Sequence, residues 1–80
     1  MEEIIMTLKI GTIVRVISDN ENYTKFNKKL LEVTHIAHNT KEHPGYDNSV
    51  YPEALCDFVE YKSRKKVPCS LYEYEFEIIN

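Results

Sequence analysis

The sequence predicts an all-β domain, a small antiparallel barrel of five short strands, and three observations support this fold class. Towards the C-terminus, aromatic residues and then Ile78 alternate with glutamates over residues 72–78, the period of two that is typical of a strand with one buried face. Upstream, short runs of β-branched residues are separated by Gly, Pro, Asn and Asp, which favour turns. No window has a sustained helical spacing of apolar residues, and the best one, 23–32, predicts at most one helical turn.

The first two expected strands are the runs richest in β-branched residues. One spans residues 8–17, where Val14 and Val16 flank Arg15. The other spans residues 30–37 and carries apolar residues on both faces, so its pattern leaves the buried face open. One face of this strand holds Leu31, Val33 and His35, and the other holds Leu30, Glu32, Thr34 and Ile36.

The C-terminal half predicts two more extended segments, which brings the count from the pattern to four or five short strands. A third strand is expected over residues 54–61, and the basic segment 62–66 after it has the composition of a hairpin tip. Residues 68–71 follow with a proline and predict a short turn of 3₁₀ type before the last strand. In that strand we expect the tyrosines to face the core, and the glutamates Glu73, Glu75 and Glu77 to form a wet outer face.

Composition predicts one cytoplasmic domain over residues 8–80, with residues 1–7 as a short N-terminal extension. The chain has 80 residues, 42% of them hydrophobic, and a formal net charge of −3. It has no apolar run long enough to span a membrane, and its acidic start does not resemble a signal peptide. Its two cysteines do not make a disulfide framework, and no cofactor is implied.

The order of these segments resembles the SH3-like barrels found in small bacterial proteins. The opening strand, residues 8–17, is similar to the x-x-G-x-x-V-R-V start of such barrels, and residues 68–77 are similar to their last turn and strand. Residues 26–36 resemble the second strand of KOW-type members, with Lys28 and Leu31 where those members carry glycines. The ending is also similar to small proteins of bacteria and their phages. The resemblance covers residues 8–79 and implies a binding barrel with no particular activity.

Residues able to carry chemistry are few, and their spacing does not predict an enzyme. His35, His38 and His43 lie in or beside a loop, but neither they nor Cys56 and Cys69 have the paired short spacing of a zinc site. Cys56 lies in the middle of a strand pattern, where a thiol packs more often than it reacts. With two glycines in the chain, no phosphate-binding loop is available. We therefore expect no catalytic residues and no metal, with a histidine metal site kept as a third hypothesis.

The strongest binding candidate is the long loop over residues 38–53. Loops of this length are uncommon in compact domains and are often functional. Tyrosine is a favoured anchor of protein interfaces, and the alternative is that a loop tyrosine folds back to cap the barrel. The predicted protein-binding residues are Tyr46, Asp47, Tyr51 and Tyr23. We thus expect a protein-interaction module, in a sharper form a phage- or mobile-element-encoded modulator of a host protein, that is a monomer or a homodimer through an edge strand.

An alternative function is nucleic-acid binding by the basic residues. Seven of the ten positive charges fall into two clusters, one before the second strand and one at the hairpin tip. If the barrel brought them to one side, they would contact phosphates despite the negative net charge. The residues of this alternative site are Lys25, Lys28, Lys29, Lys62, Arg64, Lys65 and Lys66.

Overall fold

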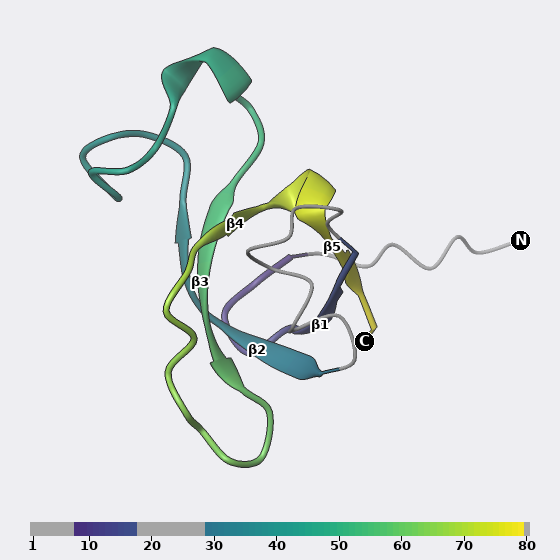
Figure 1. Cartoon of the computed structure of the whole chain (residues 1–80). Coiled ribbons are helices and arrows are strands. Elements are labelled where there is room, and N and C mark those ends of the chain that lie inside the picture. The colour runs from purple at the N-terminus through teal and green to yellow at the C-terminus, as the bar shows by residue number, and fades with distance from the viewer. Residues whose placement is uncertain (1–7, 18–28, 80) are drawn as a thin grey trace, which may run out of the picture.

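The computed structural model of the chain describes residues 8–17 and 29–79. Within these ranges the fold is all-β, as predicted, and contains five strands, two 3₁₀ turns and no α-helix (Figure 1). The elements in chain order are β1 (Ile13–Val16), β2 (Leu30–Ala37), η2 (Asn48–Val50), β3 (Leu55–Glu60), β4 (Leu71–Tyr72), η3 (Glu73–Glu75) and β5 (Phe76–Ile78). The N-terminal extension, Tyr23, Lys25 and Lys28 lie outside the described residues.

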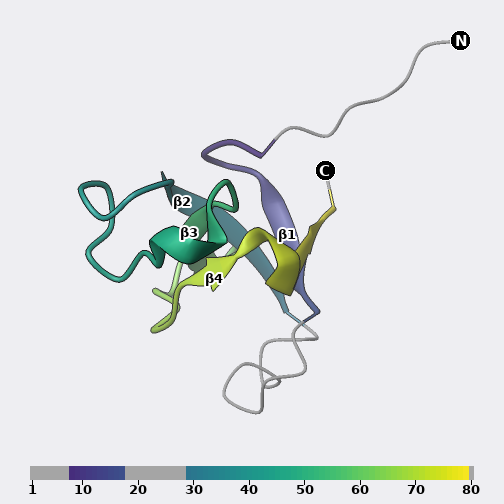
Figure 2. The same ribbon diagram turned by 90° about the horizontal axis from the view of Figure 1, so that it is seen from above.

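The five strands form one antiparallel sheet in the order β4-β3-β2-β1-β5. The predicted closed barrel is not observed, because the edge strands β4 and β5 do not pair with each other and the sheet is open. The three residues of η3 connect one edge strand directly to the other, which requires the sheet to curl. Figure 2 shows η3 beside β1, where Ile17 N donates to the Glu75 carbonyl at 2.9 Å.

The prediction of one continuous last strand is wrong, because η3 divides this segment into β4 and β5. Tyr72 lies at the N-terminal cap of η3, and its backbone N–H donates to Glu75 Oε1 at 3.1 Å in a reciprocal capping arrangement. The turn therefore lies at Glu73–Glu75, directly before β5, and not over residues 68–71 as expected. The turn also breaks the period of two, so that Phe76 is buried while Tyr74 is 59% exposed.

A bulge in β2 resolves the face that the sequence left open. The pairing of β2 with β3 shifts between Val33 and His35, so Thr34 is an extra residue without a counterpart on β3. After the shift, Ile36 lies opposite Cys56 and packs against the core, while His35 lies opposite Asp57. His35 therefore does not share the core face of Leu31 and Val33, and its side chain is exposed.

The core lies on the concave side of the curled sheet and draws on every strand. Phe58 and Phe76 meet edge to face, with ring centroids 5.4 Å apart and planes at 81°. The largest fully buried side chains are Phe58, Leu31, Leu71, Val14, Val16, Val33 and Cys56. The core therefore joins all five strands of the sheet.

Candidate functional site

The loop between β2 and β3 folds back on the chain around η3. Tyr46 is 4% exposed, and its hydroxyl donates to the Glu53 carbonyl at 2.6 Å, which closes the loop on itself. The backbone N–H of Asp47 donates to the Tyr72 hydroxyl at 2.9 Å, which ties the loop to the end of β4. Asp47 also caps η2, since its carboxylate accepts from Ser49 N at 2.9 Å. Hydrogen bonds within the loop and to Tyr72 therefore hold it in one defined conformation.

Three tyrosine rings form a continuous row from the interior of this loop to the surface. Tyr46 meets Tyr72 edge to face, with centroids 5.9 Å apart and planes at 65°. Tyr72 stacks on Tyr74 with centroids 5.8 Å apart and planes only 6° from parallel. Since Tyr74 is 59% exposed, the row ends in a ring that is supported on one face and open to solvent on its remainder.

Tyr51 provides the second large exposed ring at this end of the molecule. It follows η2 and is 69% exposed, more than any other exposed large hydrophobic residue in the described chain. Tyr51 also lies close enough to the buried Tyr46 to influence its pKa. We call the exposed rings of Tyr51 and Tyr74, with the neighbouring carboxylates of Asp47 and Glu53, the tyrosine surface.

The tyrosine surface is electrostatically negative. The pKa of the Tyr74 hydroxyl is raised, first by partial burial and then by neighbouring groups that include Glu75, Glu53 and Asp47. The carboxylate of Asp47 is ionised at neutral pH, because its hydrogen bonds from Ser49 hold its pKa below the ordinary value. Besides burial, the carboxylates of Glu75, Glu53 and Asp47 all raise the pKa of Tyr74, so their negative charges lie in the same region as its exposed ring.

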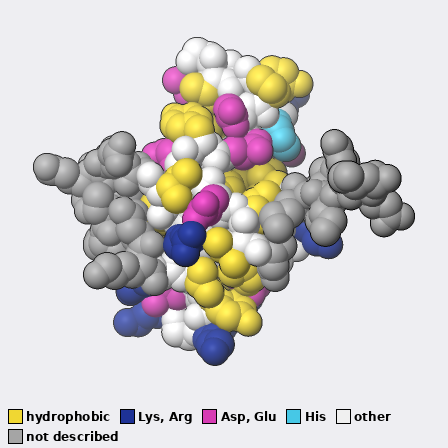
Figure 3. Space-filling model, turned by 90° about the vertical axis from the view of Figure 1, so that its right-hand side faces the viewer, with side chains coloured by type: hydrophobic (Ala, Val, Ile, Leu, Met, Phe, Trp, Pro, Cys, Tyr) yellow, Lys and Arg dark blue, Asp and Glu magenta, His cyan; other side chains and the backbone are white. Residues whose placement is uncertain are grey.

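The charges around the tyrosine surface differ in their pairing from those of the sheet. The Lys and Arg ion pairs within the described residues lie on the sheet or its adjoining segments: Arg15–Glu77, Lys29–Glu60 and Arg64–Glu32. His43 lies 3.5 Å from Asp57 and forms an ion pair with it only when its ring is protonated. No described residue forms an ion pair with Asp47, Glu53 or Glu73. Figure 3 shows most of the acidic side chains of this face in its upper half and most Lys and Arg side chains in its lower half, with hydrophobic side chains in both.

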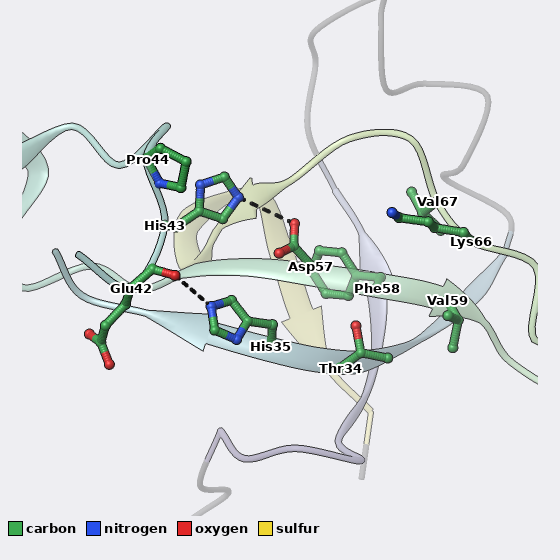
Figure 4. A pocket seen from close by; sticks show the side chains of 10 residues that line it. All are labelled: Thr34, His35, Glu42, His43, Pro44, Asp57, Phe58, Val59, Lys66 and Val67. Carbon is green, nitrogen blue, oxygen red and sulfur yellow. Dashed lines mark hydrogen bonds and ion pairs between the residues drawn. The ribbon is translucent and has the colours of Figure 1, made fainter. Parts of the chain in front are cut away.

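A second feature is an open hollow of about 750 Å³ on the outer face of β2 and β3. Figure 4 shows His43 and Pro44 above it, His35 below, Asp57 between them, and Lys66 on the opposite side. The rings of His35 and His43 have centroids 6.4 Å apart. The bulge at Thr34 places His35 here, because it turns this side chain away from the core.

Hydrogen bonds in the hollow fix the tautomer of His43. Gly45 N donates to Nδ1 at 3.0 Å, so in the neutral ring Nε2 carries the proton. That nitrogen lies 3.1 Å from Ser70 Oγ and 3.5 Å from Asp57, and the Ser70 hydroxyl donates to Asp57 Oδ1. The proton on Nε2 points at Ser70, so His43 does not act as a base towards that hydroxyl, and the arrangement is unlike a Ser-His-Asp triad. The three side chains form a hydrogen-bonded tie between the loop, β3 and the segment before β4.

The remaining candidates for metal or thiol chemistry are not gathered in one place. Within residues 8–17 and 29–79, no three His, Cys, Asp or Glu side chains are placed to hold a metal ion. His35 Nε2 donates to the Glu42 carbonyl at 2.8 Å, and His38 lies outside the lining of the hollow. Cys56 is fully buried, and burial, with smaller contributions from Glu73 and Asp57, raises the pKa of its thiol to about 12.

The structure distributes the predicted protein-binding residues unevenly. Asp47 and Tyr51 are exposed in the loop, whereas Tyr46 is buried, with its hydroxyl bonded to the Glu53 carbonyl of the same loop. Tyr74 was not predicted as a site residue, since the alternating pattern placed it in the core. The signal that exposes it is the reciprocal capping of η3 by Tyr72 and Glu75, which is visible only in three dimensions.

Of the predicted basic site, the structure describes five residues. Lys29 lies 3.3 Å from Glu60, and Arg64 lies 2.6 Å from Glu32, so both already neutralise carboxylates of the sheet. Lys62, Lys65 and Lys66 are exposed at or beside the hairpin tip and form no ion pair with a described residue.

Comparisons with known proteins give no further assignment. The chain matches no protein-family model, no curated protein and no solved structure. Among the described residues, none of the helical segments has the length and apolar character needed to cross a bilayer.

Proposed function

We propose that this chain is a non-catalytic protein-interaction module that binds a protein partner through the tyrosine surface. The observation that carries the proposal is the pair of rings Tyr51 and Tyr74, which are 69% and 59% exposed, near Asp47 and Glu53, two carboxylates with which no described residue forms an ion pair. Tyrosine is enriched at interfaces because it offers a large contact area and a polar tip at small cost in side-chain entropy.

The contacts that hold the Tyr74 ring in place favour a binding role for this exposed side chain. Tyr74 is held by its stack on Tyr72, and Tyr72 in turn is held by Tyr46 and by the Asp47 amide. A ring held in place before binding loses less conformational freedom when a partner covers it, which increases affinity for a given contact area. The ordered loop thus presents its aromatic residues on a prepared surface.

Two narrower statements belong to the same proposal. We propose that the open sheet belongs to the SH3-like class of small barrels, on the support of its five antiparallel strands and the 3₁₀ turn directly before β5. We also propose that the partner is a host protein modulated by a phage- or mobile-element-encoded chain, on the support of the small, acidic, single-domain character of the sequence. The binding proposal does not depend on either statement.

Affinity capture from a lysate of the native source tests the proposal. The bait is the whole chain, and the variant carries Tyr51→Ser and Tyr74→Ser together. The matched control is Tyr61→Ser, which removes a tyrosine that is 42% exposed beside Lys62 at the hairpin tip. We expect a protein that is recovered with the wild type and the control but lost with the double variant. Equal recovery with all three baits would contradict the proposal.

A second candidate function is nucleic-acid binding, and one observation favours it. Lys62, Lys65 and Lys66 lie together at the end of the molecule opposite η2, and no described carboxylate pairs with them. Phosphate contacts of this kind weaken steeply as salt is added. A gel shift at low ionic strength, with Lys62→Gln and Lys65→Gln as the variant, decides this alternative. The absence of any shift with both single- and double-stranded probes would remove it.

A further inference from the structure

We infer that the tyrosine surface holds a cationic side chain of a basic protein segment, with the cation against the exposed face of Tyr74. This inference deepens the proposed function and rests on it. It assigns the chemical class of the partner: a segment that contains arginine, with lysine as a weaker substitute. Three properties of the described residues lead to this class.

The first property is an open aromatic face. Tyr72 covers one side of the Tyr74 ring in a nearly parallel stack, yet the side chain remains 59% exposed, so its outer side is available. The face of an aromatic ring carries a negative electrostatic potential, and a cation placed over it is attracted. The same chain has such a contact elsewhere, since Lys62 Nζ lies 5.9 Å from the centroid of the Tyr61 ring.

The second property is the charge around this ring. Glu75, Glu53 and Asp47 all act on the Tyr74 hydroxyl, so their charges lie within electrostatic range of the ring. Asp47 and Glu53 form no ion pair with any described residue, whereas the carboxylates of the sheet at positions 32, 60 and 77 each have a basic partner. An apolar segment would bring no positive charge to Asp47 and Glu53, and an acidic segment would be repelled by them.

The third property is the combination of an exposed aromatic ring with negative charge, which favours arginine over lysine. A guanidinium is planar, stacks on an aromatic face, and at the same time presents donors in its plane to a carboxylate. A lysine ammonium is a strongly hydrated point charge and satisfies the carboxylate and the ring less well together. A stacked, exposed ring with carboxylates within electrostatic range therefore favours a guanidinium over an ammonium group.

A second copy of this chain is the competing occupant, because the hairpin tip is basic. The arginine of the hairpin tip, Arg64, already pairs with Glu32 at 2.6 Å and would have to break that contact. A head-to-tail contact between opposite ends of identical chains would also build rings or open-ended filaments, not a simple symmetric dimer. We therefore assign the surface to a different protein, and self-association is one outcome of the test.

The test is an NMR titration of the isotope-labelled whole chain at low ionic strength. The probe is a synthetic peptide of alternating glycine and arginine, compared with peptides of the same length that carry lysine or the neutral arginine analogue citrulline. We expect saturable shifts centred on Asp47, Glu53 and the Tyr74 ring with arginine, a weaker response with lysine, and none with citrulline. Equal responses to arginine and citrulline, or shifts confined to other surfaces, would overturn the inference.

Matched variants separate a specific site from general attraction to an acidic protein. Tyr74→Leu keeps the net charge and is expected to weaken arginine-peptide binding about fivefold, as loss of a cation–π contact would, while Tyr61→Leu leaves binding unchanged. Glu53→Gln is expected to weaken binding more than Glu77→Gln, although both remove one negative charge. Equal effects within either pair would contradict the site.

Two further results complete the test. Concentration-dependent self-association that competes with the peptide and is lost in Lys62→Gln/Lys65→Gln would overturn the assignment to a different protein. If lysate capture depends on Tyr51 and Tyr74 while the arginine peptide produces no local response, the proposed function stands and the inference about the cation fails. The two failures are therefore distinguishable.

Discussion

The Nε2 atom of His43 lies 3.1 Å from Ser70 Oγ and joins the loop that carries the tyrosine surface to the segment before β4. Gly45 N–H donates to the other ring nitrogen, Nδ1, and the Ser70 hydroxyl donates to Asp57, so each donor in this series of hydrogen bonds has one acceptor. The direction of the hydrogen bonds makes this group a structural tie. It positions the loop without supplying a base or a nucleophile.

Ser70→Ala is expected to lower the free energy of unfolding by about 1 kcal/mol, because it removes a part-buried hydroxyl that both donates and accepts. Urea denaturation measures the loss, and amide exchange at Gly45 should quicken. Ser63→Ala is the matched control, since that hydroxyl is exposed and its contact with Glu60 is long, at 3.4 Å. Equal effects of the two substitutions would show that the tie does not stabilise the loop.

Thr34 is expected to be dispensable, because it has no counterpart on β3. Deleting it removes the bulge but leaves His35 opposite Asp57 and Ile36 opposite Cys56, so the later side chains keep their faces, and we expect only a small change in the free energy of unfolding. Deleting Glu32, which pairs with Val59, shifts the register by one residue and turns core side chains outward; we expect a loss of about 2–4 kcal/mol, comparable with a large core substitution. Urea denaturation measures both losses, and equal losses from the two deletions would refute the bulge.

The same bulge shows why sequence reasoning reached the strands more readily than the site. The second strand was predicted over residues 30–37, as observed, because β-branched residues and flanking turn formers are local signals. The bulge depends on pairing with β3, so no pattern within β2 reveals that His35 faces Asp57. The sequence therefore predicted the strand but not the position of His35 in the hollow.

The tyrosines follow the same logic. Tyr51 belongs to a loop that its length and turn formers marked as a binding candidate. Which loop tyrosine folds back depends on the Glu53 carbonyl that receives the Tyr46 hydroxyl, a contact set by the path of the whole loop. Tyr74 was assigned to the core because alternation predicts a continuous strand. Capping between Tyr72 and Glu75 instead forms η3 and turns Tyr74 out.

The thiol of Cys56 is expected to be unreactive in the folded chain. Burial, with smaller contributions from Glu73 and Asp57, raises its pKa to about 12, so little thiolate exists at neutral or mildly alkaline pH. In a Cys69→Ser variant, a thiol-specific chromogenic disulfide should react only as fast as the protein unfolds, and promptly in denaturant. Rapid labelling of that variant without denaturant would show that Cys56 is not buried in the core.

Alkaline conditions are expected to destabilise the loop through its tyrosines. The pKa values of Tyr46 and Tyr74 are raised above 10.0, for both chiefly by burial and then by neighbouring groups that include Asp47 and Glu53. Because the folded pKa is the higher one, their stabilisation is complete below pH 10 and is lost as pH rises through the folded values. Unfolding free energies measured across this range should fall less in Tyr46→Phe/Tyr74→Phe than in the wild type. An identical decline would exclude these two tyrosines as its cause.

Site-specific photo-crosslinking tests the central claim most directly, because it reports which ring a partner covers. A photoreactive phenylalanine analogue is placed singly at Tyr51, Tyr74 or Tyr61, three exposed positions of which the last lies at the opposite, basic end. In lysate of the native source, irradiation should join one and the same protein to positions 51 and 74, and an excess of the unlabelled chain should suppress the adduct. Position 61 should give no such adduct. Crosslinking to a discrete protein from position 61 alone, or equally from all three positions, would contradict binding through the tyrosine surface.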